Sequence, residues 1–372
     1  MIAAKLNPAG AQEEPVQSNK IMKSVINLDS EVCEKEKLFL GKPLGIINTC
    51  NMKYPVFDRL YKEQRSFIWI PDEISMEKDR SDIQELSDTE RFIFENNLSF
   101  QTVGDSFLGR GIDEVLNYVT NSEFKLSLKT HSWFEECIHT PSYSHAIQNI
   151  YNDPAARFDL ILKTPAIKDR AKDSVEKFNS LLNVNDGDLR KIIVNTLIGL
   201  LALEGISFYN SFSTSFFFAK NGKMTGTGSI IKLVRRDERV HKANIINALR
   251  ILVKEESEDF LDLKSHIEDT VISTFLEMAN QEFSWIDYQC SNGEMPGFSN
   301  KMSKDYVKYL TDKTLQELGI HKDTLIFGGT KNPFPWIDSY VGSGKSTQVA
   351  PQEMEIVNYV KSSKNDLGDM DF

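Results

Sequence analysis

Two copies of an E-x-x-H motif are the part of this sequence best suited to chemistry. They run from Glu136 to His139 and from Glu238 to His241. Residues three apart lie on one face of a helix, so the carboxylate and the imidazole of each copy would point at the same place. One such match is weak evidence, because about half a match is expected by chance and a surface pair explains it equally well. Two matches in one chain favour a metal site.

A lone acid precedes each motif within an apolar helical stretch. Asp105 lies 31 residues before Glu136, and Glu204 lies 34 residues before Glu238. Two antiparallel helices whose residues sit at equal height need such a separation, with arms of about 15 residues or about 22 Å each. The chain therefore presents the unit acid, turn, E-x-x-H twice. Two units packed together predict a two-metal site in a ferritin-like four-helix bundle, with the ligands Asp105, Glu136, His139, Glu204, Glu238 and His241.

The main alternative to a metal site is a buried ion-pair network. Glu204 lies between Leu203 and Ile206, and no Lys or Arg stands within one turn of it. A buried carboxylate with no cation to pair with is costly, which favours metal binding. Carboxylate oxygens and imidazoles suit both Fe(II) and Mn(II), so the residues do not decide between iron and manganese.

Tyr143 lies four residues after His139 and should project from nearly the same helix face. From spacing alone, such a tyrosine is most often a packing residue with a satisfied hydroxyl. Phe208 and Phe212 follow Glu204 at intervals of four, and with Val234 they would line the site with groups that donate no protons. A dry pocket of this kind would suit a long-lived tyrosyl radical.

Helical periodicity that could position these residues extends from about Ser87 to Cys290. We expect an all-α, ferritin-like bundle with additional helices, in which Ser87 and Glu90 form a capping box. The expected organisation is a flexible N-terminal extension (1–20), the di-metal helical domain (21–340) and a flexible C-terminal tail (341–372). The longer helices should cover roughly 87–107, 123–151, 188–220, 229–255 and 257–288.

Composition narrows the class of protein. The net charge of −11 argues against nucleic-acid binding. The apolar stretch 192–219 is long enough to span a membrane, but Asn195, Glu204 and Asn210 interrupt it, so a buried core helix of a soluble protein is favoured.

The N-terminus and the cysteines indicate the cellular compartment. Residues 1–20 lack the apolar region of a signal peptide. The four cysteines show no metal spacing, which indicates reduced thiols in the cytoplasm. The Gly-Ser-rich run 342–346 does not complete a phosphate-binding loop.

Over nearly its whole length the chain resembles the small subunit of class I ribonucleotide reductase, of the bacterial and phage type. The order, the spacing and the flanks of the motifs agree together. The matching runs are Asp105-Ser106 with Gly109-Arg110, Glu136 to His145, Leu203 to Phe212, Arg236 to His241, Pro335 to Ile337 and Val349 to Glu353.

This resemblance implies a homodimer with two iron ions per chain, in an oxo-bridged di-iron cofactor that reacts with dioxygen to form a radical on Tyr143. The radical would serve a large catalytic subunit that reduces ribonucleoside diphosphates to the deoxyribonucleotides needed for DNA replication. The resemblance also assigns Trp69 and Asp237 to the radical-transfer route, and Tyr359 in the tail to the relay into the large subunit. The acidic end of the tail, 366–372, would dock on that subunit.

Two other functions share part of this pattern. A different di-metal oxidase on the same fold would act without a partner subunit, and it would not need Trp69, Asp237 and Tyr359. An iron-storage or purely structural helical protein would not need Tyr143 in a phenylalanine-lined pocket. Both alternatives are less favoured on these grounds.

Overall fold

The computed structural model describes residues 24–28, 36–184, 188–254, 260–321 and 324–341. Within these ranges the chain forms helices and no strands, with isolated bridges at Phe39–Val119 and Met295–Phe298. The all-α prediction is therefore confirmed for the described part of the chain. The helices are α1 (Pro55–Arg65), α2 (Glu77–Glu85), α3 (Asp88–Leu116), α4 (Ser122–Phe134), α5 (Thr140–Ile150), α6 (Pro154–Ile161), α7 (Pro165–Leu182), α8 (Leu189–Ala202), α9 (Phe208–Lys220), α10 (Thr225–Lys254), α11 (Lys264–Gln289), α12 (Asn300–Leu318) and α13 (Trp336–Val341).

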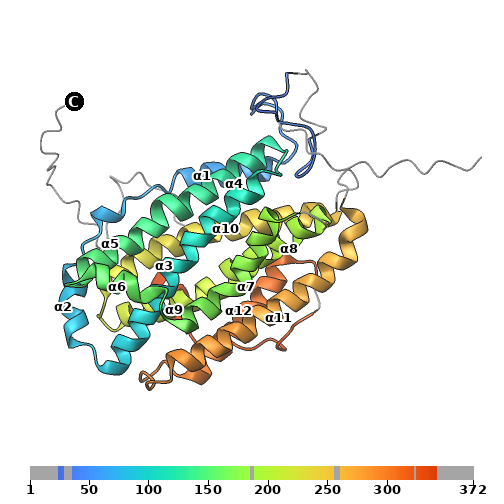
Figure 1. Cartoon of the computed structure of the whole chain (residues 1–372). Helices are drawn as coiled ribbons and strands as arrows, with labels where there is room; N and C mark the ends of the chain where they lie inside the picture. Colours follow the sequence, from blue (N-terminus) through green and yellow to red (C-terminus); the bar gives the residue numbers. More distant parts are fainter. Residues whose placement is uncertain (1–23, 29–35, 185–187, 255–259, 322–323, 342–372) are drawn as a thin grey trace, which may run out of the picture.

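Four long helical arms form the centre of the molecule (Figure 1). They are α3, the run α4–α5, the run α8–α9, and α10, and each packs against others of the set. Helices α7, α11 and α12 cover α3, α8 and α9 from one side, while α1 and α2 pack on α4, α5 and α10. The paired arms have the arrangement that the repeated spacing of acid and E-x-x-H predicts.

The helix ends follow local sequence signals. Ser87 caps α3 and forms the expected capping box with Glu90. Asn121 caps α4, and Asp153 caps α6 immediately before a proline at its first position. The last long helix was expected from about 257, which lies outside the described residues, and α11 begins at Lys264 after a short 3-10 turn, Leu261–Leu263.

Two π-turns interrupt the long arms, and each carries acids expected at the metal site. Glu135–His139 (η3) joins α4 to α5, and Leu203–Ser207 (η4) joins α8 to α9. A π-turn accommodates one extra residue, and it therefore changes which side chains of a helix face the core. Such turns often occur at functional sites.

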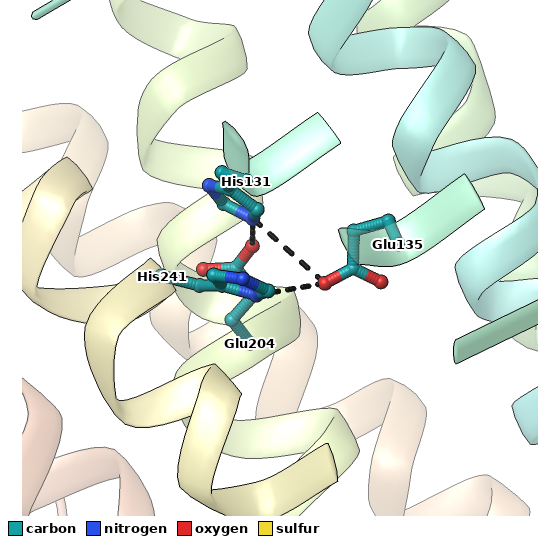
Figure 2. Close-up of side chains that lie close together, drawn as sticks. All are labelled: His131, Glu135, Glu204 and His241. Atoms are coloured by element: carbon teal, nitrogen blue, oxygen red, sulfur yellow. Dashed lines mark ion pairs between the residues drawn. The ribbon is translucent and has the colours of Figure 1, made fainter. Parts of the chain in front are cut away.

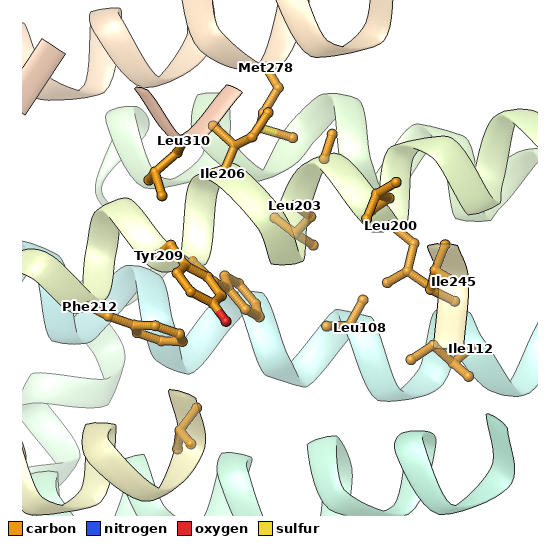
Figure 3. Packing of buried hydrophobic residues seen from close by; sticks show 14 of the residues in the cluster. Leu108, Ile112, Leu200, Leu203, Ile206, Tyr209, Phe212, Ile245, Met278 and Leu310 are labelled. Atoms are coloured by element: carbon orange, nitrogen blue, oxygen red, sulfur yellow. The ribbon is translucent and has the colours of Figure 1, made fainter. Parts of the chain in front are cut away.

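The continuous run from Leu189 to Lys220 contains the apolar stretch that is long enough to span a membrane. In the most apolar 18-residue segment of this run, 89% of the residues are buried inside the bundle. Leu203, Ile206 and Phe212 of this run pack among side chains from α3, α11 and α12, such as Leu108, Met278 and Leu310 (Figure 3). The run is thus the central helix of a large apolar core, as predicted.

Candidate metal centre

Seven ionisable side chains converge in the middle of the bundle. All are at most 1% exposed, so they meet in a site shielded from bulk water. Helix α3, the run α4–η3, the turn η4 and helix α10 supply them. The set consists of four carboxylates, Asp105, Glu135, Glu204 and Glu238, and three imidazoles, His131, His139 and His241.

One half of the cluster brings two imidazoles and two carboxylates together (Figure 2). His241 Nδ1 lies 2.8 Å from Glu135 Oε1, and His131 Nε2 lies 2.6 Å from Glu204 Oε1. His131 Nε2 also lies 3.9 Å from Glu135 Oε1. Donor atoms from all four side chains fall within 4.8 Å of one another, which is the size of a single coordination sphere.

The other half is centred on His139. Its Nδ1 lies 3.3 Å from Glu135 Oε2, 3.5 Å from Glu238 Oε1 and 3.7 Å from Asp105 Oδ2. Glu238 also reaches the first half, because its Oε2 lies 3.4 Å from His241 Nδ1. Glu135 and Glu238 therefore stand between the two groups, where bridging carboxylates of a two-metal site would be placed.

Glu136, the acid of the first E-x-x-H motif, is not part of this cluster. Its side chain is 45% exposed and lies 3.8 Å from Arg110 Nε, on the outside of the bundle. The expectation assumed a regular helix, in which positions three apart share a face. In the π-turn Glu135–His139 the extra residue shifts which side chains point into the bundle. Glu135, four residues before His139, therefore points inward instead of Glu136.

His131 is a member of the cluster that sequence reasoning missed. The signal was present, because His131, Glu135, His139 and Tyr143 follow one another at intervals of four residues. Such a stripe marks one helix face as clearly as the three-residue spacing does. The other five expected ligands, Asp105, His139, Glu204, Glu238 and His241, lie in the cluster.

The hydrogen-bonding state of these groups tests whether they fit a metal. Both oxygens of each of the four carboxylates are buried without a hydrogen-bond partner. The Nδ1 atoms of His139 and His241 and both ring nitrogens of His131 also lack one. Buried polar groups are almost always satisfied, so this many converging orphan atoms indicates a binding site for cations. Two divalent ions would neutralise the four carboxylates.

Electrostatics support the same assignment. Burial raises the pKa values of Asp105 and Glu204 well above the usual range, and the neighbouring carboxylates raise them further. Burial also acts to raise the pKa of Glu135, but His139 and His241 outweigh it and lower the value. Burial and the adjacent His241 hold the pKa of His131 well below its usual range, so its ring is neutral near pH 7. In the described chain, the ion pairs of these carboxylates involve histidines and no Lys or Arg.

Asp237 connects the cluster to Trp69. Its Oδ2 accepts a hydrogen bond of 2.8 Å from Trp69 Nε1 and lies 3.3 Å from His139 Nε2. Its Oδ1 accepts two hydrogen bonds from the guanidinium of Arg236, which stacks over the Phe67 ring. The structure thus brings Trp69, Asp237 and His139 together as the resemblance implied, and it adds Arg236 as an anchor. Tyr359 and the tail lie outside the described residues.

Tyr143 is 1% exposed, and its hydroxyl is among the buried atoms without a partner. Burial raises its pKa well above the usual range, and the negative charge of Asp105 adds to the rise. Phe208, Phe212 and Val234 are buried in the same continuous apolar core. Phe208 lies against Gly104, the residue before Asp105.

The sequence of residues 46–333 matches the family model described as "Ribonucleotide reductase, small chain". The chain belongs to this family. It is 33% identical to the ribonucleoside-diphosphate reductase 1 subunit beta of Salmonella typhimurium, over 88% of this chain and 92% of that protein. It is 30% identical to the subunit beta of Enterobacteria phage T4, over 94% of this chain and 97% of that protein. The resemblance to bacterial and phage small subunits is confirmed.

Solved structures of the small-chain family share the fold. The R2 subunit from Clostridium botulinum superposes with a TM-score of 0.78 at 24% identity, covering 86% of this chain and 98% of that one. The dimanganese(II)-NrdF of Streptococcus sanguinis gives a TM-score of 0.65 at 18% identity, covering 80% of this chain and 99% of that one. The expected ferritin-like helical bundle is confirmed.

Proposed function

We propose that this chain is the radical-generating small subunit of a ribonucleoside-diphosphate reductase, with a two-metal centre that oxidises Tyr143. The observation that carries the proposal is the cluster of buried, unsatisfied carboxylate and imidazole atoms, three of whose members (His131, Glu135 and His139) lie 12 or fewer residues before that tyrosine on the same helical arm. Iron is the proposed metal, and manganese is the alternative that the same donors accept. The two ions would be held by Asp105, Glu135, His139, Glu204, Glu238 and His241.

Glu135 replaces Glu136 in this ligand set. It is buried between His139 and His241, whereas Glu136 is exposed beside Arg110. A ligand must have its oxygen inside the cluster, and a carboxylate on the outer surface of the bundle does not reach it. The fourth acid of the set is therefore the first Glu of the Glu135-Glu136 pair.

When bound, the metal pair would supply the oxidising power by reacting with dioxygen. The protein's part is to control the proton of Tyr143. Because burial keeps the Tyr143 pKa far above 7, the phenol remains protonated, and oxidation must remove a proton together with the electron. The Asp105 carboxylate is the charged group acting most strongly on that hydroxyl, and it is the acceptor that we propose for the phenolic proton.

Transfer of the oxidising equivalent would follow the contact from His139 through Asp237 to Trp69. In the proposed holoenzyme, Tyr359 and the docked C-terminal tail carry it on to the large catalytic subunit. The chain would act as a homodimer in the cytoplasm, and it would bind neither nucleic acid nor a membrane. Asp237 is the positioning residue of this route, because one carboxylate oxygen contacts both rings.

The test is low-temperature electron paramagnetic resonance on protein loaded with Fe(II) and exposed to air, beside the Tyr143→Phe variant. We expect a phenoxyl-type signal in the parent that is absent from the variant, with about two irons per chain in both. Two bound irons and no radical in the parent would favour a di-metal oxidase or manganese as the native metal. No bound iron and no bound manganese would overturn the proposal.

A further inference from the structure

His131 has the surroundings of a metal ligand rather than those of a structural histidine. It lies one turn before Glu135, its side chain is fully buried, and its ring stacks on His241 with centroids 3.8 Å apart and planes 17° apart (Figure 2). Its Nε2 faces Glu204 at 2.6 Å and Glu135 at 3.9 Å. It therefore points into the same space as His241, whose Nδ1 faces Glu135.

The three histidines outside the cluster behave differently. His145 and His321 each have Nε2 within hydrogen-bonding distance of a backbone carbonyl, at Ile74 and Glu268, and His266 pairs with the Asn195 amide oxygen. His131 has no hydrogen bond at either ring nitrogen, and the short approach to Glu204 lacks hydrogen-bond geometry. A buried imidazole is normally satisfied, so the unpaired Nε2 of His131, the nitrogen that faces Glu204, requires another explanation.

Coordination to a shared ion explains the approach. Two donors bonded at about 2.1 Å to one ion, at right angles, lie about 3 Å apart. The separations from His131 to Glu204 and from His241 to Glu135 are 2.6 and 2.8 Å, close to that value. Both distances are those expected between neighbouring ligands of one ion. The donor atoms of all four side chains also lie within 4.8 Å of one another, so a single ion could bind them all.

We propose that His131 is a third imidazole ligand of the two-metal centre, binding through Nε2 to the ion held by Glu135, Glu204 and His241. This inference rests on the proposed two-metal function. The centre is then asymmetric, because one ion has two imidazole ligands and the other, beside Asp105, has only His139. The ion beside His131 is therefore the one whose binding should weaken when the His131 imidazole is removed.

The first test is a crystal structure of the full-length protein loaded with Mn(II), with anomalous diffraction locating the ions. We expect two ions, with His131 Nε2 within about 2.3 Å of one of them. A separation greater than about 3 Å from both ions, with Nε2 donating a hydrogen bond to Glu204 instead, would overturn the inference while leaving the two-metal centre standing.

The second test is a Mn(II) titration of the parent, His131→Gln and the control His321→Gln. The parent and the control should bind two ions alike, and His131→Gln should lose at least about tenfold affinity for one ion only. Thermal unfolding of the metal-free proteins shows whether the variants fold. Equal affinities in the parent and a folded His131→Gln would overturn the inference. Absence of binding in the parent would overturn the two-metal centre as well.

Discussion

Glu135 Oε1 lies 2.8 Å from His241 Nδ1, although Glu136 is the acid that completes the E-x-x-H motif. The two neighbouring glutamates have opposite environments, since Glu135 is fully buried and Glu136 lies outside the bundle near Arg110. The difference arises from one π-turn, which rotates the helix face carrying Glu135 toward the metal centre.

A matched pair of substitutions separates the two glutamates. We expect Glu135→Gln to weaken binding of both ions, because Glu135 lies between the two halves of the cluster. Glu136→Gln should bind metal as the parent does and unfold within about 0.5 kcal/mol of it. The measurement is a Mn(II) titration of the metal-free proteins with a chelator as competitor. The reverse pattern would return Glu136 to the ligand set.

The sequence predicts most of the bundle because its signals are local or periodic. The capping box at Ser87, the break before Pro154 and the equal spacing of acids and E-x-x-H motifs all depend on regular helix geometry. Glu136 was expected to face inward from regular α-helix geometry, whereas residues 135–139 form a π-turn in which Glu135 faces inward instead. No local signal in Glu135-Glu136 states which of two adjacent acids faces inward, since burial is decided by the packing of α3 against η3.

The site beyond the motif depends on tertiary contacts that spacing does not reveal. Arg236 donates hydrogen bonds to the neighbouring Asp237. Phe67, 169 residues earlier in the sequence, holds the Arg236 guanidinium through its ring and its backbone carbonyl oxygen. His131, in contrast, has a local signal in the sequence, because it begins the stripe of residues four apart that continues through Glu135 and His139 to Tyr143.

Replacing Asp237 should impair transfer of the radical to the large subunit and leave metal binding unchanged. In Asp237→Asn the amide group cannot accept hydrogen bonds at both ends, so either Arg236 or the Trp69 contact loses its acceptor. We expect two bound ions as in the parent and reductase turnover with the large subunit, normalised to Tyr143 radical, reduced at least about tenfold. The control is Asp262→Asn, whose carboxylate pairs with Arg190 at an exposed position. Turnover per radical equal to that of the control would contradict the transfer route.

A buried ion pair holds the second π-turn. Glu282 accepts two hydrogen bonds from Arg170, at 2.7 and 2.6 Å, and one each from Ser207 and Asn210. Glu282→Ala would leave the Arg170 charge buried without a partner, at a cost of about 3–5 kcal/mol in the free energy of unfolding. Glu277→Ala, on the exposed face of the same helix, should cost no more than about 0.5 kcal/mol. Chemical denaturation of both variants measures the difference, and a mild effect at Glu282 would show that the pair does not anchor the turn.

The metal-free protein should lose stability as the pH rises. The pKa values of Asp105, Glu204 and Glu238 are raised in the folded state by burial and then by neighbouring carboxylates. The folded state therefore holds more protons than the unfolded chain above about pH 4. The stability that these carboxyls contribute is fully present below that pH, and it is lost as the pH rises through their folded-state pKa values. His139, also raised, acts in the same direction, whereas His131, whose pKa is lowered, opposes it below about pH 6.5.

Thermal unfolding between about pH 5.5 and about pH 8, with and without Mn(II), measures this effect. The metal-free Tm should fall with pH, and the increase on adding metal should grow, because ligands must be deprotonated to bind. Glu204→Gln removes one of the titrating carboxyls, and it should flatten the decline of the metal-free Tm. If the Tm of the metal-free protein falls equally steeply with pH in the parent and in Glu204→Gln, the assignment of a raised pKa to Glu204 is contradicted.

Gly104 gives Phe208 the space to lie beside the metal centre. A Cβ at position 104 would stand 2.8 Å from Phe208 Cε1 and 3.1 Å from Cζ, so Gly104→Ala must displace the ring. Overpacking of this kind costs about 1–3 kcal/mol in the free energy of unfolding. If Phe208 helps to exclude water from Tyr143, the displaced ring should also shorten the lifetime of the radical, which is measured as the decay of its resonance signal.

The control for Gly104→Ala is Gly45→Ala, where the added Cβ meets only the Asn27 carbonyl oxygen, at 3.4 Å, the edge of ordinary contact. Adding Phe208→Leu to Gly104→Ala removes the ring edge that clashes, so it should recover part of the lost stability. It should not restore the radical lifetime, because the smaller side chain leaves the pocket incompletely filled. Recovery of both properties would show that Phe208 acts through packing alone, and a radical of unchanged lifetime in Gly104→Ala would remove Phe208 from the pocket of Tyr143.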